Sequence, residues 1–220
     1  KLKAIEADAA TRVVVLTGAG KIFSSGADLE WMRAMANYDQ ETNRQDALRL
    51  AELMEVLNSL PKPTIACVNG SAFAGAVGLI ACCDIAVANK QAEFALTEVR
   101  LGLAPAVISL YVMAAIGERQ ARRLFLSAER ITATEAHRIG LVHEVASTDT
   151  LQESVERQVN YLLKAGPEAL AACKRLVVKR TPREVVEETV DMIAQLRASP
   201  EGQEGMAAFF EKRKPKWVQD

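Results

Sequence analysis

Residues 61–83, with the sequence PKPTIACVNGSAFAGAVGLIACC, decide the fold class of this chain. Two prolines end the preceding segment, and residues 64–68 form a short apolar run that predicts a buried strand. Residues 69–75 are small or polar and predict a turn, and residues 76–83 are apolar on all sides and predict a buried helix. Residues 84–88 repeat the strand pattern. This order of strand, turn, helix and strand predicts an α/β protein.

The same alternation continues on both sides of this segment until about residue 145, and only helices are predicted beyond it. The predicted strands are residues 12–17, 64–68, 84–88, 93–96 and 141–145. The predicted helices before residue 145 are residues 29–36, 44–60, 76–83, 109–116, 118–127 and 132–139. We therefore expect an α/β core over residues 1–145 and a helical region over residues 146–220. Residues 1–8 are typical of the last turns of a helix without an N-terminal cap, so we expect an upstream segment in the natural protein.

The composition is that of an ordinary globular protein. The 220 residues are 50% hydrophobic and 25% charged, and 27 basic against 28 acidic side chains give a formal charge of −1. This balance argues against a protein that binds nucleic acid through a broad basic face. No apolar run approaches the roughly 18 to 20 residues that a membrane helix needs, and residues 1–10 are too polar for a signal peptide. We expect a soluble, cytoplasmic protein that does not associate with membranes.

Several chemical motifs are incomplete in this sequence. Residues 17–21, TGAGK, are not a P-loop, because Val15 and Ile22 stand where a glycine and a hydroxyl residue are needed. The dinucleotide fingerprint fails because Phe23 replaces its third glycine. The four cysteines contain no C-x-x-C pair and only two histidines accompany them, so we expect no metal site. We read His137 and His143 as structural or surface residues.

Two turns of small residues, at residues 23–28 and 69–78, each lead from a predicted strand into a predicted helix. Small residues let a ligand approach the backbone, and a helix start offers N–H groups that lack an intrahelical partner. Two such turns that face each other could hold one anionic oxygen. Taken singly, each turn is better explained by glycines that only relieve strain and permit tight packing.

Six segments in this order resemble the crotonase superfamily, also called enoyl-CoA hydratase/isomerase. They are residues 15–29 (VLTGAGKIFSSGADL), 61–70, 83–88, 93–105, 136–142 and 210–215. The resemblance implies a spiral of ββα units with a C-terminal helical trimerisation region, and N-terminal strands that would precede this chain. It also implies acyl-CoA thioester substrates and assembly as a homotrimer or a dimer of trimers. Coenzyme A would enter only as part of the substrate, with no metal or redox cofactor.

The resemblance assigns catalytic roles to three positions. The backbone N–H groups of Ala27 and Gly75 would bind the thioester oxygen, and Glu98 would be the general acid/base at the neighbouring carbon. A carboxyl group that lines an apolar pocket has a raised pKa, which suits proton transfer near neutral pH. Substrate contacts are expected from Ser25, Asp28, Leu29, Gly78, Pro105 and Lys212. Lys21, Arg33, Arg100 and residues 212–216 are further candidates for contacts with the phosphates of coenzyme A.

Gly78 departs from the family pattern, because hydratases with two glutamates carry their second glutamate at this position. Residues 74–78 and 98–109 are most similar to the methylglutaconyl-CoA and isohexenylglutaconyl-CoA type of hydratase. We therefore expect water addition to a branched, carboxylated enoyl thioester, with Gly78 leaving room for the branch. An enoyl-CoA isomerase that uses the same three catalytic positions is the alternative enzyme. RNA binding, as in a family relative, and a catalytically inactive oligomeric scaffold are the alternatives outside catalysis.

Overall fold

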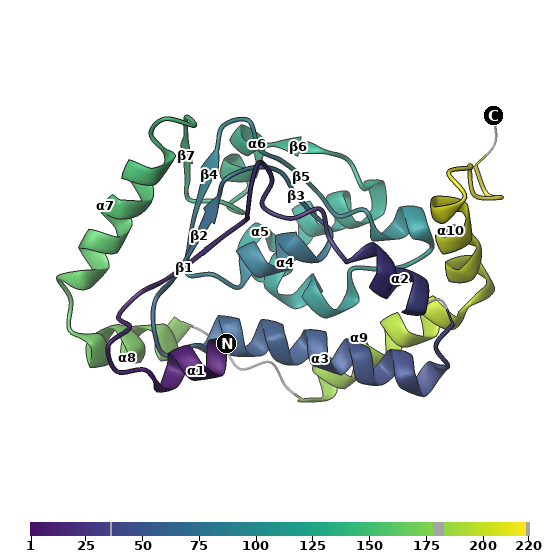
Figure 1. Ribbon diagram of the computed structural model, residues 1–220, viewed down its shortest axis with the longest axis horizontal. Coiled ribbons are helices and arrows are strands. Elements are labelled where there is room, and N and C mark those ends of the chain that lie inside the picture. Colours follow the sequence, from purple (N-terminus) through teal and green to yellow (C-terminus); the bar gives the residue numbers. More distant parts are fainter. Residues whose placement is uncertain (36, 178–182, 219–220) are drawn as a thin grey trace.

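The computed structural model describes residues 1–35, 37–177 and 183–218, and its centre is a four-stranded parallel sheet (Figure 1). The strand order is β1 (Val14–Thr17), β2 (Thr64–Val68), β4 (Ile85–Asn89) and β7 (Glu144–Ala146). The register pairs Val14 with Thr64 and Ile65 with Ile85. Parallel neighbours need crossover connections, and helices supply them here.

A second, smaller sheet lies beside the first and carries the turns of interest. It consists of β3 (Ala72–Phe73), β5 (Glu93–Ala95) and β6 (Ile131–Thr132). β3 and β5 are parallel, whereas β5 and β6 are antiparallel. β3 and β6 were not predicted, because a strand of two residues has no detectable alternation.

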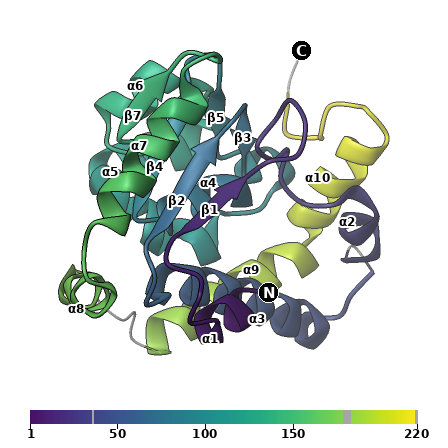
Figure 2. The same cartoon turned by 60° about the vertical axis from the view of Figure 1, so that its left-hand side comes forward.

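Helices cover the main sheet on both faces. The described residues form the helices α1 (Leu2–Ala7), α2 (Leu29–Met35), α3 (Gln40–Ser59), α4 (Gly75–Ala81), the 3-10 helix η1 (Glu98–Leu101), α5 (Ala106–Ser127), α6 (Ala133–Arg138), α7 (Leu151–Leu163), α8 (Pro167–Val177), α9 (Arg183–Ala198) and α10 (Pro200–Phe210). α7 packs on one face of the sheet, and α4 and α5 lie beyond the other (Figures 1 and 2). α3 and α9 lie side by side below the sheet.

The alternation of side chains along β2 explains how one strand serves two cores. All five of its residues are buried. Ala66 and Val68 belong to the main core, whereas Ile65 and Cys67 pack with residues of α7 on the opposite face. Successive side chains of a strand point to opposite faces, so a strand covered on both sides must be apolar throughout. The continuous apolar run in the sequence has this cause.

The predicted elements agree with the structure in order and differ in detail. The expected break at Gly117 is confirmed, since α5 has a non-helical backbone there with φ 75° and ψ 157°. The predicted strand 141–145 is shifted to Glu144–Ala146, because the N–H groups of Leu141 and Val142 bond to the carbonyl of Ala136 and end α6 instead. The predicted breaks at Pro167 and Pro200 are helix starts. Residue 36 and residues 181–182, where another helix end and break were expected, lie outside the described residues.

Within the described ranges, no helix is both long enough and apolar enough to cross a membrane.

A buried ion pair attaches α8 to the sheet. The Lys174 ammonium donates to Asp84 over 2.7 Å, and Asp84 also accepts hydrogen bonds from the N–H and the hydroxyl of Thr64. We expect Lys174→Met to lower the free energy of unfolding by about 2 kcal/mol, because it leaves a partly buried carboxylate without its counter-ion. Urea unfolding measures this loss, and Arg175→Met at the exposed neighbouring position should lose far less. Equal losses in the two variants would contradict the role of the pair.

Candidate active site

The two turns lie side by side because their backbones are hydrogen-bonded to each other. The N–H groups of Phe23 and Ser24 both donate to the carbonyl of Ser71, over 3.1 and 3.3 Å, and Phe73 N–H donates to the carbonyl of Ser24 over 3.1 Å. Ser24 and Ala72 form a parallel bridge. Ser24, in the first turn, therefore extends the edge of the small sheet beside β3. Both turns leave the sheet in the same direction.

Asn69 and Gly70 contact residues 18–21, the segment between β1 and the first turn. The Asn69 amide accepts from Gly18 N–H and donates to the carbonyl of Gly20, both over 3.0 Å. A Cβ atom on Gly70 would lie 2.1 Å from the carbonyl oxygen of Lys21, so only glycine fits this contact. The tight packing of Gly70 against Lys21 is therefore also what lets the two segments approach each other.

The residues that precede the two predicted oxyanion positions have unusual backbone angles. Gly26 has φ 107°, and Ala74 has φ 53° with ψ −126°. An alanine with positive φ is strained, typically by about 1–3 kcal/mol, and such strain is often found at functional sites. A Cβ added to Gly26 would lie 3.6 Å from the Cβ of Ala74, so these two residues lie close to each other.

Each special residue is followed by a predicted oxyanion donor. Ala27 lies just before α2, and Gly75 is the first residue of α4. Within the described part of the chain, neither N–H group donates a hydrogen bond. Two backbone donors without partners, on turns in contact with each other, can bind one carbonyl oxygen and stabilise negative charge on it.

Glu98 begins η1 beyond the same end of the small sheet. Phe73 pairs with Ala95, and Ala74 N–H donates to the carbonyl of Ala95 over 2.9 Å, so the chain after β5 continues beside Gly75. Among the described residues, the buried Glu98 Oε2 atom has no hydrogen-bond partner. Burial raises the pKa of Glu98 to about 7, because the charged form loses its hydration and a backbone hydrogen bond at Glu98 offsets only part of that loss. A carboxyl group with this pKa can both give and accept a proton near neutral pH.

The space predicted beside Gly78 is occupied, and this expectation is wrong. Gly78 is buried where α4 packs on α5, and a Cβ on it would lie 2.3 Å from the Cγ2 atom of Ile108. The position therefore offers no room for a substrate branch. It also has no room for a second glutamate unless Ile108 is replaced.

Asp28 and Arg100 have structural partners. The Asp28 carboxylate caps α2, since one of its oxygens accepts from the N–H groups of Glu30 and Trp31, each over 2.9 Å. Arg100 donates to the carbonyl of Ala128 over 2.7 Å at the end of α5. A substrate contact from either residue stays a prediction.

The other predicted binding residues lie around the two turns and on nearby helices. Ser25 and Leu29 are exposed, and Pro105 is buried at the start of α5. Lys212 is exposed in the turn after α10, which packs on η1. Arg33 of α2 lies over the ring of Phe210 at 5.3 Å, so α10 also contacts the helix that follows Ala27.

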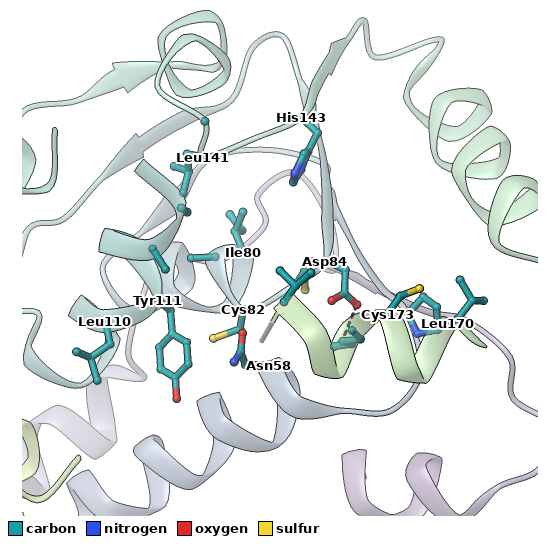
Figure 3. A pocket seen from close by; sticks show the side chains of 18 of the residues that line it. Asn58, Ile80, Cys82, Asp84, Leu110, Tyr111, Leu141, His143, Leu170 and Cys173 are labelled. Atoms are coloured by element: carbon teal, nitrogen blue, oxygen red, sulfur yellow. Dashed lines mark hydrogen bonds and ion pairs between the residues drawn. The ribbon is translucent and has the colours of Figure 1, made fainter. Parts of the chain in front are cut away.

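A cavity of about 1000 Å³ lies at the opposite end of α4 from Gly75 (Figure 3). Residues of α4, α5 and α8 line it, with His143 at one side; among them are Ile80, Cys82, Leu110, Tyr111, Leu170 and Cys173. His143 accepts a hydrogen bond from Ala86 N–H over 3.0 Å, and burial lowers its pKa. Burial raises the pKa of the Cys82 thiol. Ala27, Gly75 and Glu98 do not line this cavity, so we place the candidate active site at the two turns.

Comparisons with known proteins show which family this chain matches. Residues 1–220 match the protein family described as enoyl-CoA hydratase/isomerase. A crystal structure of an enoyl-CoA hydratase from Shewanella pealeana is 44% identical, with a TM-score of 0.77 over 98% of this chain and 82% of that one. One from Mycobacterium avium is 35% identical, with a TM-score of 0.85 over 99% and 83%. The 2,3-dehydroadipyl-CoA hydratase of Escherichia coli is 32% identical over 98% of this chain and 84% of that protein.

The buried carboxyl of Glu98 makes stability depend on pH in a defined direction. Its pKa of about 7 in the folded protein exceeds the ordinary value of 4.5, so between these values the folded state holds one proton more than the unfolded state. We expect the wild type to lose stability relative to Glu98→Gln as the pH rises through this interval, by about 3 kcal/mol. Above the folded pKa the difference should stay constant.

Urea unfolding of both proteins between about pH 4 and pH 9 measures this difference. Glu153→Gln, at an exposed position of α7, is the matched control and should follow the wild type throughout. Parallel pH profiles for wild type and Glu98→Gln would show that the carboxyl has an ordinary pKa.

Proposed function

This chain belongs to the enoyl-CoA hydratase/isomerase family, and on that premise we propose that it adds water reversibly to the double bond of an enoyl-CoA thioester. The observation that carries the proposal is the position of Glu98. Its carboxyl, whose buried Oε2 atom has no hydrogen-bond partner among the described residues, follows the strand that is hydrogen-bonded to the turn containing Gly75. In this proposal the proton donor, Glu98, and the oxyanion donors, the N–H groups of Ala27 and Gly75, lie at one end of the small sheet.

The proposed reaction uses three groups of this chain. The N–H groups of Ala27 and Gly75 bind the thioester oxygen, and the negative charge that develops there when water adds to the β-carbon is stabilised by both donors. Glu98 gives its proton to the α-carbon, and the proton that the added water releases restores the protonated Glu98; the reverse reaction follows the same steps backwards. The pKa of about 7 keeps both protonation states available near neutral pH. The reaction written this way needs no metal or redox cofactor.

Activation of water distinguishes this protein from hydratases with two glutamates. Ile108 occupies the place beside Gly78, so the protein offers no second carboxylate at that position. A 3-methyl group on the substrate would support positive character at the β-carbon and would weaken the need for a strong base. A carboxylate within the acyl group could orient the water.

We therefore propose a branched, carboxylated enoyl thioester of the 3-methylglutaconyl-CoA kind as the substrate. The similarity to a hydratase named for 2,3-dehydroadipyl-CoA, a dicarboxylic acyl group, supports the carboxylate. With Gly78 closed, the branch must be accommodated elsewhere than that position. Ser25, Asp28, Leu29, Pro105 and Lys212 remain the proposed contacts with the substrate.

An isomerase that moves the double bond is the second candidate. The single carboxyl and the apolar Ile108 favour it, because a proton shuttle needs one acid/base group and no activated water. Its product has the mass of the substrate, whereas hydration adds the mass of one water. Product masses therefore separate the two functions.

We expect the purified protein to hydrate 3-methylglutaconyl-CoA faster than crotonyl-CoA, measured as kcat/KM with products identified by mass. Glu98→Gln should lower kcat by about 10²–10⁴, because the amide keeps the shape of the side chain and cannot transfer the proton. The exposed Glu153→Gln is the control for both substrates. Faster turnover of crotonyl-CoA would reject the proposed substrate class, and unchanged kcat in Glu98→Gln would reject the role of Glu98.

We also propose assembly as a homotrimer or a dimer of trimers. Leu176 and Val177 of α8 are 85% and 79% exposed, and large apolar side chains with this exposure are typical of contact surfaces. Light scattering should give three or six times the 23.9 kDa of one chain. The mass of a single chain in solution would contradict the assembly.

A further inference from the structure

The consecutive helices α2 and α3 meet the distant helix α9 at a cluster of Trp31, Asp46 and Arg197. The Trp31 indole N–H donates to Asp46 Oδ1 over 3.1 Å, and an Arg197 Nη1–H donates to Asp46 Oδ2 over 3.0 Å. The Arg197 guanidinium also lies over the Trp31 ring, 5.1 Å from its centroid. Each member therefore contacts both others, and together they join α2, α3 and α9.

The two charged groups of this cluster are largely removed from solvent, which is unusual. The side chain of Arg197 is 6% exposed and that of Asp46 is 15% exposed. Among the described residues, the buried Arg197 Nε atom has no hydrogen-bond partner. A buried ion pair contributes little net stability compared with apolar packing, so its best-attested use is to specify one arrangement of the elements that it joins. We therefore ask which arrangement of helices the Asp46–Arg197 pair specifies.

The element that this cluster orients is the helix that follows Ala27. Asp28 caps α2 and accepts the backbone N–H of Trp31, so this tryptophan is bound through its backbone to Asp28 and through its side chain to Asp46. α2 has only seven residues. Because α2 is short and Trp31 lies in its first turn, a movement of Trp31 also moves the capping residue Asp28. Ala27, the residue before Asp28, then moves with it.

We propose that Trp31, Asp46 and Arg197 are positioning residues that fix the direction of the Ala27 N–H relative to the Gly75 N–H. The inference rests on the proposed function, in which these two groups bind the thioester oxygen. Stabilisation of developing charge depends on donors that are already aligned, and misplacement of a donor lowers the rate more than it lowers substrate binding. The cluster therefore acts on kcat, although none of its members needs to touch the substrate.

Trp31→Phe tests this directly, because it keeps an aromatic ring for Arg197 and removes the N–H that binds Asp46 together with the second ring of the indole. We expect kcat to fall about tenfold, less than the 10²–10³ for loss of a whole oxyanion donor, with KM changed by no more than about twofold. A dimethylamino-substituted cinnamoyl-CoA reports the polarisation of the carbonyl, since hydrogen bonds to its oxygen shift the absorption to longer wavelength. The shift on binding should be smaller in Trp31→Phe than in the wild type.

Asp191→Asn is the matched control. Asp191 pairs with Arg44 over 2.6 Å and joins the same helices α3 and α9, but neither residue lies on α2. This variant should retain the wild-type kcat and the full spectral shift. Equal shifts and equal kcat in the wild type and Trp31→Phe, with the probe bound, would overturn the positioning role and leave the proposed function intact. A wild type that shifts no probe and turns over no enoyl thioester would overturn both.

Discussion

The hydrogen bonds between the backbones of residues 23–24 and 71–73 are the constraint on which the candidate site depends. They place two chain segments that are almost fifty residues apart against each other, so that both leave the small sheet in one direction. Gly26 and Ala74 then turn the chain through positive φ angles, and the following N–H groups remain without partners within the described residues. A backbone site of this kind requires close approach and small residues, and it places few demands on side-chain chemistry.

Burial of Glu98 complements these donors. The carboxyl follows β5, which pairs with β3, and no hydrogen bond from the described residues reaches its Oε2 atom. The cost of burying the charge raises the pKa of this group into the range where a proton is exchanged readily. The small sheet of three short strands thus carries both the proposed oxyanion turn at Gly75 and the proposed acid/base group.

Contacts between helices exclude a second carboxylate at Gly78 and fix the orientation of α2. Ile108 of α5 fills the place beside Gly78 on α4, which removes the possibility of a second carboxylate there. On the other side, Asp46 and Arg197 hold α2 through Trp31. Glu98 is therefore the one carboxyl that we propose for proton transfer among the described residues of this site. This arrangement suits a reaction in which the substrate itself assists the addition of water.

The sequence by itself determined the α/β class, the order of the elements, the two small-residue turns and, through its resemblance to a family, the three candidate catalytic positions. These features are local, because apolar runs, glycines and prolines act on neighbouring residues. The expectation at Gly78 was wrong because Ile108 is thirty residues away in sequence, and only the packing of α4 on α5 brings it into contact. The roles of Asn69 and of the Trp31 cluster were equally invisible, since hydrogen bonds between distant segments leave no periodic pattern. Only tertiary structure decided which groups meet, which are buried and which pKa values change.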